Sequence, residues 1–255
     1  MKSNDITKYI TSFIIIIIII LIFSQGSCSN PVEPVNNNDT VKAEVSNGIL
    51  PLKVGYYWKY KNYNLREDSS IAGEGIDDEY KITKYSKITL GDTNYVVFHS
   101  IYGYLDSTGY IFDSDEWYLK NFHDGLYLMG GNYEADSIYA KLIWYKYPVK
   151  KGESWQSPHL VYNLIQNKYL IEDTVSYTCI DTSAIFNTPL GNFKCVVYYH
   201  RWVDNEGDAM SIWDIYDYYS YNMGLVGELT YEPDPTTQKD IPLYKKVLTQ
   251  TNVNN

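Results

Sequence analysis

The chain has 255 residues, of which 45% are hydrophobic, and its formal net charge is −10. Arginine occurs only at Arg66 and Arg201, and no stretch of the sequence is strongly basic. Such a chain is not expected to bind nucleic acid or to dock electrostatically on anionic lipid. Its 28 Tyr, 6 Trp and 7 Phe favour β-strands, because aromatic rings suit half-buried pleated surfaces.

The N-terminal segment has the features of an export signal. Lys2 and Lys8 precede an apolar run over residues 13–23 that contains seven consecutive isoleucines. As a helix this run would be about 16 Å long, too short to cross a membrane core about 30 Å thick. A basic start, a short apolar core and small residues after it predict a secretory signal peptide over residues 1–27.

Gly26, Ser27 and Cys28 close this segment and resemble the lipobox of bacterial lipoproteins. In that family the cysteine is lipidated and becomes the new N-terminus, and acyl chains on Cys28 would hold the protein on a membrane. Gln25 departs from the family, which usually has Leu there. Ser29, in place of an aspartate retention signal, implies sorting to the outer membrane, facing the periplasm or the cell surface. A secreted protein in which Cys28 has no role is the alternative.

Residues 28–48 are rich in Pro, Asn and Ser and lack an apolar period. They are predicted to be a flexible tether between the lipid and a folded domain.

The chain from 49 to 250 is predicted to be an all-β domain of about 12 antiparallel strands. In the first half, strands are expected near 50–63, 80–90, 95–104, 110–122, 126–129 and 138–147. The acidic residues 66–79 are read as an exposed loop, and residues 113–116 as an interruption within the fourth strand. In the second half, the segment 159–170 is ambiguous between strand and short helix. Further strands are expected near 174–186, 192–203, 210–221, 224–231 and 243–249.

One eight-residue pattern occurs twice. PLKVGYYW at 51–58 and PVKKGESW at 148–155 share Pro-x-Lys-x-Gly-x-x-Trp, so that Gly55 and Trp58 correspond to Gly152 and Trp155. Other matches follow in the same order: Gly91 with Gly191, Trp117 with Trp213, Gly125 with Gly224, and Tyr145 with Tyr244. They predict two related units, 51–147 and 148–250, of about six strands each, forming a curved sheet, an open barrel or a sandwich. Chance coincidence in a Tyr-rich β protein is the alternative.

Cys179 and Cys195 remain once Cys28 is assigned to lipid. Two cysteines in an oxidising compartment usually pair. However, a tight turn at 188–191 would place Cys195 opposite Ala184, leaving Cys179 about 16 Å away along the strand, against a Cα limit of about 7 Å. A disulfide between them therefore needs a bend in the strand, and the sequence leaves this open.

No residue pattern points to a metal, a cofactor or catalysis. The four histidines lack the spacing of zinc ligands. The acidic runs at 113–116 and 204–208 lack the spacing of an EF-hand loop, so we interpret them as solvated turns between strands. No Gly-x-Ser-x-Gly motif occurs, and no glycosidase pair of carboxylates can be located.

PLKVGYYW, TPLGNFKC (188–195) and YYSYNMGLV (218–226) are similar to segments of uncharacterised lipoproteins of Gram-negative bacteria. That resemblance implies a cell-envelope protein without known catalytic residues. The leading hypothesis is a non-catalytic, membrane-tethered β domain that has a binding or structural role, its partner being an apolar ligand, a glycan or an envelope protein. A lipid carrier of the lipoprotein-chaperone type is the alternative and needs a deep apolar cavity. A carbohydrate-active hydrolase needs two carboxylates in a cleft.

Overall fold

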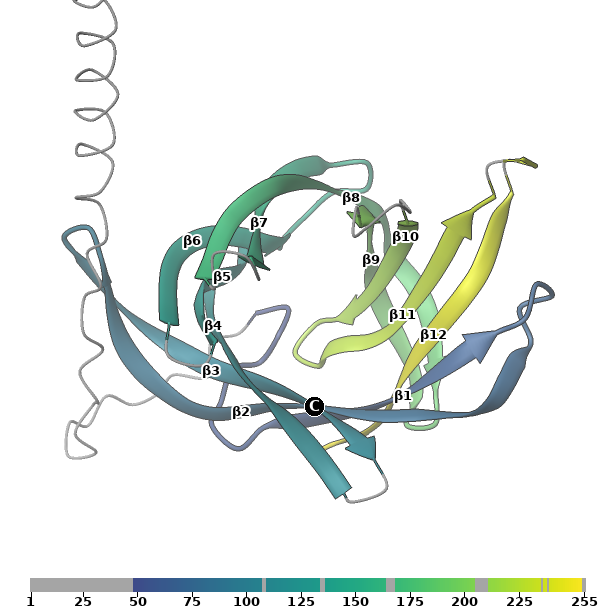
Figure 1. Ribbon diagram of the computed structural model, residues 1–255, viewed down its shortest axis with the longest axis horizontal. Helices are drawn as coiled ribbons and strands as arrows, with labels where there is room; N and C mark the ends of the chain where they lie inside the picture. Colours follow the sequence, from purple (N-terminus) through teal and green to yellow (C-terminus); the bar gives the residue numbers. More distant parts are fainter. Residues whose placement is uncertain are drawn as a thin grey trace, which may run out of the picture. The chain divides into compact units, whose positions relative to one another are not determined.

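Twelve antiparallel strands form one sheet that curls into a nearly closed barrel (Figure 1). The computed structural model describes residues 48–106, 109–133, 136–163, 168–204, 211–234, 236–237 and 239–253, which belong to one compact unit. The strands are β1 (Tyr57–Leu65), β2 (Ile71–Leu90), β3 (Thr93–Asp106), β4 (Gly109–Phe122), β5 (Gly125–Tyr133), β6 (Asp136–Lys146), β7 (Ser154–Asn163), β8 (Lys168–Thr188), β9 (Gly191–Asp204), β10 (Ser211–Ser220), β11 (Gly224–Pro233) and β12 (Asp240–Thr251). The prediction of an all-β fold with about 12 antiparallel strands is confirmed, and the curved sheet replaces the sandwich.

The segment up to residue 47 lies outside the described residues. It includes the predicted signal peptide, Cys28 and nearly all of the predicted tether. In the part of the chain that the structure does describe, no helix is long and apolar enough to cross a membrane.

The strand order is β6-β5-β4-β3-β2-β1-β12-β11-β10-β9-β8-β7. Strands adjacent in sequence therefore pair, with the exception of β6 and β7. β1 pairs with β12, where Trp58 lies opposite Thr251, and this ladder joins the two halves of the chain in the middle of the sheet. β6 and β7 are the two edges, although they follow each other in the chain.

The repeated pattern forms the same turn in both halves. The Gly55 amide donates to the Ile82 carbonyl at 2.8 Å, and the Gly152 amide donates to the Cys179 carbonyl at 2.7 Å. The return bonds, from Ile82 to Tyr56 and from Cys179 to Glu153, are both 2.9 Å. Both glycines have positive φ, +89° and +83°, which L side chains rarely adopt. The fixed glycine of the pattern is thus explained by backbone geometry.

One of the sequence matches does not occupy equivalent positions. Tyr145 lies opposite Leu126, at the start of β5. Tyr244 lies opposite Thr230, well along β11. The two tyrosines that the sequence matches to each other therefore occupy different positions along their hairpins in the sheet.

The prediction of an exposed loop over residues 66–79 is wrong. The turn is confined to the residues before Ile71, where the Asp68 carboxylate accepts the Ser70 amide at 2.9 Å. β2 then runs without interruption to Leu90. Its first half has the composition of a loop, with glycines and acidic residues, and several of its residues line a pocket.

Two further local predictions are corrected or settled. β4 continues through residues 113–116, and Glu116 is no solvated turn residue: its carboxylate contacts His99 at 2.9 Å and Lys84 at 2.9 Å. The ambiguous segment 159–170 contributes the end of β7 and the start of β8, and is therefore strand where it is described.

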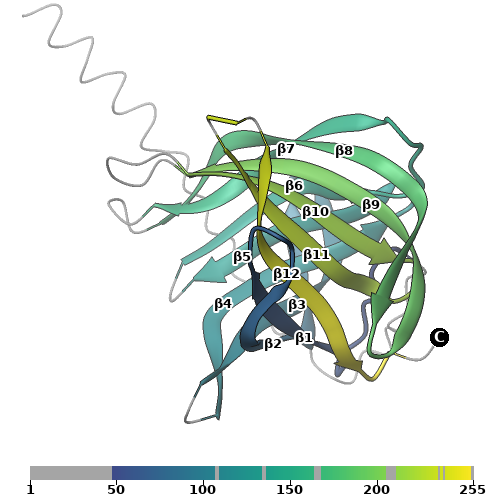
Figure 2. The same cartoon turned by 90° about the vertical axis from the view of Figure 1, so that its right-hand side faces the viewer.

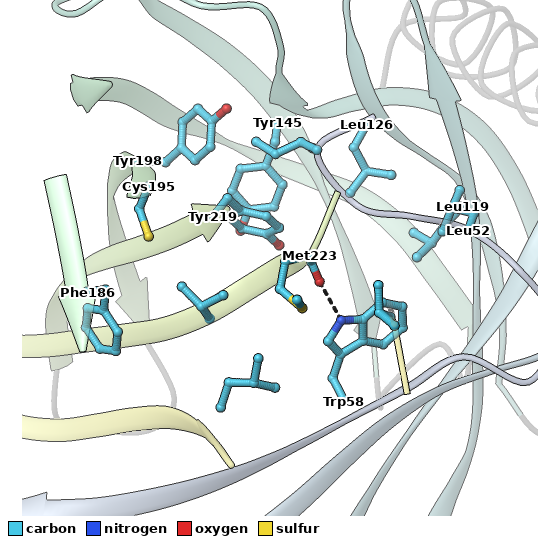
Figure 3. Close-up of a cluster of buried hydrophobic side chains, with 14 of the residues drawn as sticks. Leu52, Trp58, Leu119, Leu126, Tyr145, Phe186, Cys195, Tyr198, Tyr219 and Met223 are labelled. Carbon is cyan, nitrogen blue, oxygen red and sulfur yellow. Dashed lines mark hydrogen bonds between the residues drawn. The ribbon is translucent and has the colours of Figure 1, made fainter. Parts of the chain in front are cut away.

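Aromatic side chains fill much of the inside of the curled sheet (Figure 3). The ring of Tyr145 lies 4.5 Å from that of Tyr219 and 5.1 Å from that of Tyr198, measured between centroids. Trp58 is buried beside them, and its indole Nε1 donates to the Met223 carbonyl at 2.6 Å. Buried rings of this size are the largest individual contributions to a hydrophobic core. The aromatic excess of the sequence is thus largely used for packing.

Candidate ligand-binding pocket

One face of β1 leads from the core into a pocket. Side chains alternate along a strand, so Trp58, Tyr60, Asn62 and Asn64 share a face. The first two are buried, each 2% exposed, whereas the two asparagines line a pocket of about 660 Å³. The other lining residues come from β2, β3, β11 and β12, which neighbour β1 in the sheet or follow in the strand order (Figure 2).

A bulge in β2 shapes one wall of this pocket. Asn62 lies opposite Ile76 and Asn64 lies opposite Ala72, so three residues of β2 stand against one residue of β1. Gly73 and Gly75 are two of these three residues, with φ of +85° and +78°. Bulges re-aim side chains locally, and this one places Glu74 in the pocket lining.

The base of the pocket is a network of paired charges. Asp78 is 1% exposed, and its carboxylate accepts a hydrogen bond from the Asn62 amide. The Lys246 ammonium lies 3.7 Å from Asp78 Oδ2 and 4.0 Å from Glu228 Oε2. It also lies 5.6 Å from the centre of the Tyr80 ring. Buried charges are tolerated only when they are paired in this way, so the base is held in one arrangement.

Burial and neighbouring charges shift the pKa values of the groups in this network. Burial raises the pKa of Glu228, and the nearby Lys246 only partly opposes this. Burial works against the charge on Lys246, yet Tyr80 and the carboxylates of Glu228 and Asp78 raise the pKa of the ammonium. Burial and Asp78 also raise the pKa of the Tyr102 hydroxyl. Lys246 is therefore charged and Tyr102 is a neutral donor at neutral pH.

Tyrosines form the outer part of the lining. Tyr104 is 39% exposed and Tyr244 is 48% exposed, although both are large rings. Tyr104 comes from β3 and Tyr244 from β12, while Tyr102 lies deeper. The pocket thus combines exposed aromatic surface with hydrogen-bonding groups at its base.

The residues singled out in the sequence lie elsewhere. Gly55, Gly152 and Gly91 lie in turns, Gly191 begins β9, and Trp58 and Trp155 are buried in the core. These residues do not line the described pocket. Cys28 lies outside the described residues.

Cys179 and Cys195 are both buried and are separate thiols. Cys195 lies opposite Ala184, as the turn at 188–191 predicted, while Cys179 lies opposite Tyr198. β8 is bulged between them, and both cysteines are free thiols in this structure. Burial raises the pKa of the Cys195 thiol to about 12, so this group is an unreactive thiol at neutral pH.

Two other polar clusters bridge strands. Ser86 Oγ lies 2.7 Å from His99 Nε2, and His99 Nδ1 lies 2.9 Å from Glu116 Oε2. Ser86 and His99 are 5% and 3% exposed, so this chain of bonds links β2, β3 and β4 instead of facing a substrate. In the core, Asp217 accepts bonds from Tyr145 at 2.7 Å and from His200 at 3.1 Å. Among the described residues, no group of three or more His, Cys, Asp or Glu could hold a metal ion.

Two solved structures are similar to the chain. A crystal structure described as a "putative lipoprotein" from Parabacteroides distasonis has a TM-score of 0.48 and 15% identity, and the match covers 81% of this chain and 99% of that chain. Another, described as a "putative exported protein with YmcC-like fold" from Bacteroides fragilis, has a TM-score of 0.46 and 13% identity over 80% of this chain and 98% of that chain. No protein-family model and no curated protein matches the sequence. Neither description specifies a ligand, so the chemistry of the pocket has to identify one.

Proposed function

We propose that the protein is a lipid-anchored cell-envelope lipoprotein whose β domain binds a small polar ligand without catalysing a reaction. The anchor is argued from the sequence: a short export signal ends in Gly26, Ser27 and Cys28, and a Pro- and Asn-rich tether follows. The binding role is carried by one observation, the polar pocket whose base is fixed by Asp78, Lys246 and Glu228. Pre-arranged polar groups in a concave site are typical of ligand-binding sites.

The lipid carrier is the less favoured alternative. An acyl chain needs a deep apolar cavity, and the space inside the sheet beside Trp58 is occupied by closely packed tyrosines such as Tyr145 and Tyr219. The pocket lined by Asp78, Glu228 and Lys246 has charged groups at its base, and an acyl chain would remove their remaining water contacts without offering hydrogen bonds.

The hydrolase is also less favoured. Asp78 and Glu228 do lie in one pocket, but both contact the same Lys246 ammonium. Asp78 is in addition buried and bonded to Asn62. A carboxylate with its oxygens engaged in this way is a poor nucleophile or base.

The anchor is tested by labelling cells that express the full-length chain with radioactive palmitate. We expect label in the wild type and none in Cys28→Ala, with the wild type sedimenting with the outer membrane. Cys195→Ala is the matched control and should keep the label. Equal labelling of the wild type and Cys28→Ala would contradict the lipoprotein assignment.

The binding role is tested by ligand-observed NMR on the full-length protein in detergent, with a library of sugars, amines, amino acids, carboxylates and fatty acids. Ala72 lines the pocket, so Ala72→Trp should fill it and abolish the signal of any bound compound. Ile185→Trp, at a residue that is 60% exposed and lies outside the pocket lining, is the control. A library without a binder that is sensitive to Ala72→Trp would contradict a binding role for this pocket.

A further inference from the structure

At the base of the pocket one ammonium, that of Lys246, faces two carboxylates, those of Asp78 and Glu228. The Lys246 ammonium lies 3.7 Å from Asp78 Oδ2 and 4.0 Å from Glu228 Oε2, so it offsets part of the negative charge of these carboxylates. An anionic ligand would still meet the carboxylates of Glu74, Asp78 and Glu228 and would be repelled. A cationic ligand that reached the base would meet the ammonium of Lys246. The carboxylates of the lining therefore disfavour an anion, and the ammonium of Lys246 at the base favours neutral polar groups over a cation at that place.

The hydrogen-bonding groups of the pocket are of both kinds. Lys246, the tyrosine hydroxyls and the Asn64 amide can donate, while the carboxylates and the asparagine carbonyls can accept. A ligand that satisfies such a lining has to donate and accept at neighbouring positions. Hydroxyl groups do both, and a compound with several of them matches the lining better than a pure donor or a pure acceptor.

The outer part of the pocket presents aromatic faces. Tyr104 and Tyr244 come from different strands and leave 39% and 48% of their surface exposed. Each ring offers a flat apolar face together with a polar hydroxyl. The C–H face of a pyranose ring is flat and weakly apolar, whereas its rim carries hydroxyls, so it fits between such rings and a polar base.

The geometry points to a neutral carbohydrate of one to three sugar units as the ligand of this pocket, with Tyr104 and Tyr244 stacking on the sugar and Lys246, Glu228 and Asn64 bonding its hydroxyls. The volume of about 660 Å³ lies within the usual range for small-molecule sites and accommodates a ligand of that size. This inference rests on the proposed binding function and specifies its ligand class.

The test is isothermal titration of the full-length protein in detergent with three sets of probes. The first contains neutral mono-, di- and trisaccharides of glucose, galactose, mannose and N-acetylglucosamine. The second contains choline and spermidine, and the third contains glucuronate and galacturonate. We expect binding from the first set alone, with a loss of at least tenfold in affinity in Tyr104→Ala and in Tyr244→Ala.

Tyr221→Ala is the matched control, because Tyr221 is 46% exposed and lies outside the lining of this pocket. Circular dichroism melting of each variant separates a lost contact from a lost fold. Binding of choline, spermidine or a uronate that is abolished by Ala72→Trp would overturn the carbohydrate while leaving the proposed binding function intact. Sugar binding that is insensitive to both tyrosine variants would overturn the assignment to this pocket. Absence of binding from every set would count against both inferences.

Discussion

The two turns built from the repeated pattern have the same backbone and use their tryptophans differently. Trp58 is 2% exposed and donates its indole N–H to the Met223 carbonyl at 2.6 Å. Trp155 is 8% exposed and stacks on Tyr177 at 5.6 Å with an angle of 10° between the rings. Its Nε1 has no hydrogen-bond partner among the described residues. The pattern therefore specifies the turn and the burial of an indole, while the surrounding sheet determines what the indole contacts.

The difference extends along the strands that follow. β1 continues from Trp58 through Tyr60 into the polar pocket, and Tyr80 beside it faces Lys246. Tyr177, which lies 97 residues after Tyr80, packs between Trp155 and His200 inside the core. Similar positions in the two halves thus lie beside the charged base of the pocket in one case and in close aromatic packing in the other.

Replacing a whole indole should give the largest effect. We expect Trp58→Ala and Trp155→Ala each to lower the free energy of unfolding by about 3–5 kcal/mol, because each leaves a large cavity. Urea unfolding followed by circular dichroism measures both. A loss below about 1 kcal/mol for either would contradict its place in the core.

Phenylalanine at the same positions isolates the hydrogen bond. Trp58→Phe leaves the Met223 carbonyl unpaired in a buried site and should cost about 1–3 kcal/mol more than Trp155→Phe, which removes an N–H that has no partner. Equal losses in the two variants would show that the indoles are interchangeable.

Acid should act differently on the ion pairs of the two halves. In the first half, the hydrogen bond from His99 and the Lys84 ammonium hold the pKa of Glu116 at about 2. This carboxylate contributes stability that is complete above its unfolded pKa, near 4.5, and is lost as the pH falls from about 5 towards 2. Glu116→Gln should lower the free energy of unfolding at pH 7 by roughly 2 kcal/mol and flatten its dependence on pH below 5.

The second half provides the comparison, because Asp214 is held by Arg201 through bonds of 2.7 and 2.8 Å. Arg201 lowers the pKa of Asp214, so Asp214→Asn should also flatten the acid limb. Of these two carboxylates, Glu116 is the one bonded to a histidine, so the acid limb of Asp214→Asn should keep the part that Glu116 contributes. An unchanged slope in Glu116→Gln would contradict the assignment.

The smallest effect is expected at the turn glycines. Gly55 and Gly152 have φ of +89° and +83° and no heavy atom within 4 Å of an added Cβ. Alanine at either position should therefore cost only the backbone strain, about 1 kcal/mol, and the same amount in both halves. Val54→Ala, in the same turn at a side chain that is 41% exposed, is the control and should stay within about 0.5 kcal/mol. Unequal losses would show that the two turns differ in more than their side chains.

Much of the fold was predictable because its signals are local. Asp124 and Gly125 lie where the chain turns from β4 into β5. Pro and Gly lie in the two equivalent turns, and aromatic residues are frequent within the strands. The pocket was not predictable, because its residues come from β1, β2, β3, β11 and β12 and meet only in the folded sheet. Its β2 wall has the composition of a loop, and Lys246 stands in an unremarkable Tyr-Lys-Lys sequence. A polar strand segment with two closely spaced glycines was the one available signal.

The pairing of β1 with β12 has a consequence for chain connectivity. Trp58 and Thr251 face each other across a hydrogen-bonded ladder, although they lie near the two ends of the domain in sequence. β6 and β7 are the two edge strands, although they follow each other in the chain. A circular permutant that joins the residues near 253 to those near 48 and begins near 151 would run from β7 to β12 and then from β1 to β6. Each of the described ladders would then connect consecutive strands, and the contact of longest sequence separation in the sheet would become a hairpin. Folding slows as contacts become more distant in sequence. This rearrangement would therefore keep the architecture and raise the folding rate.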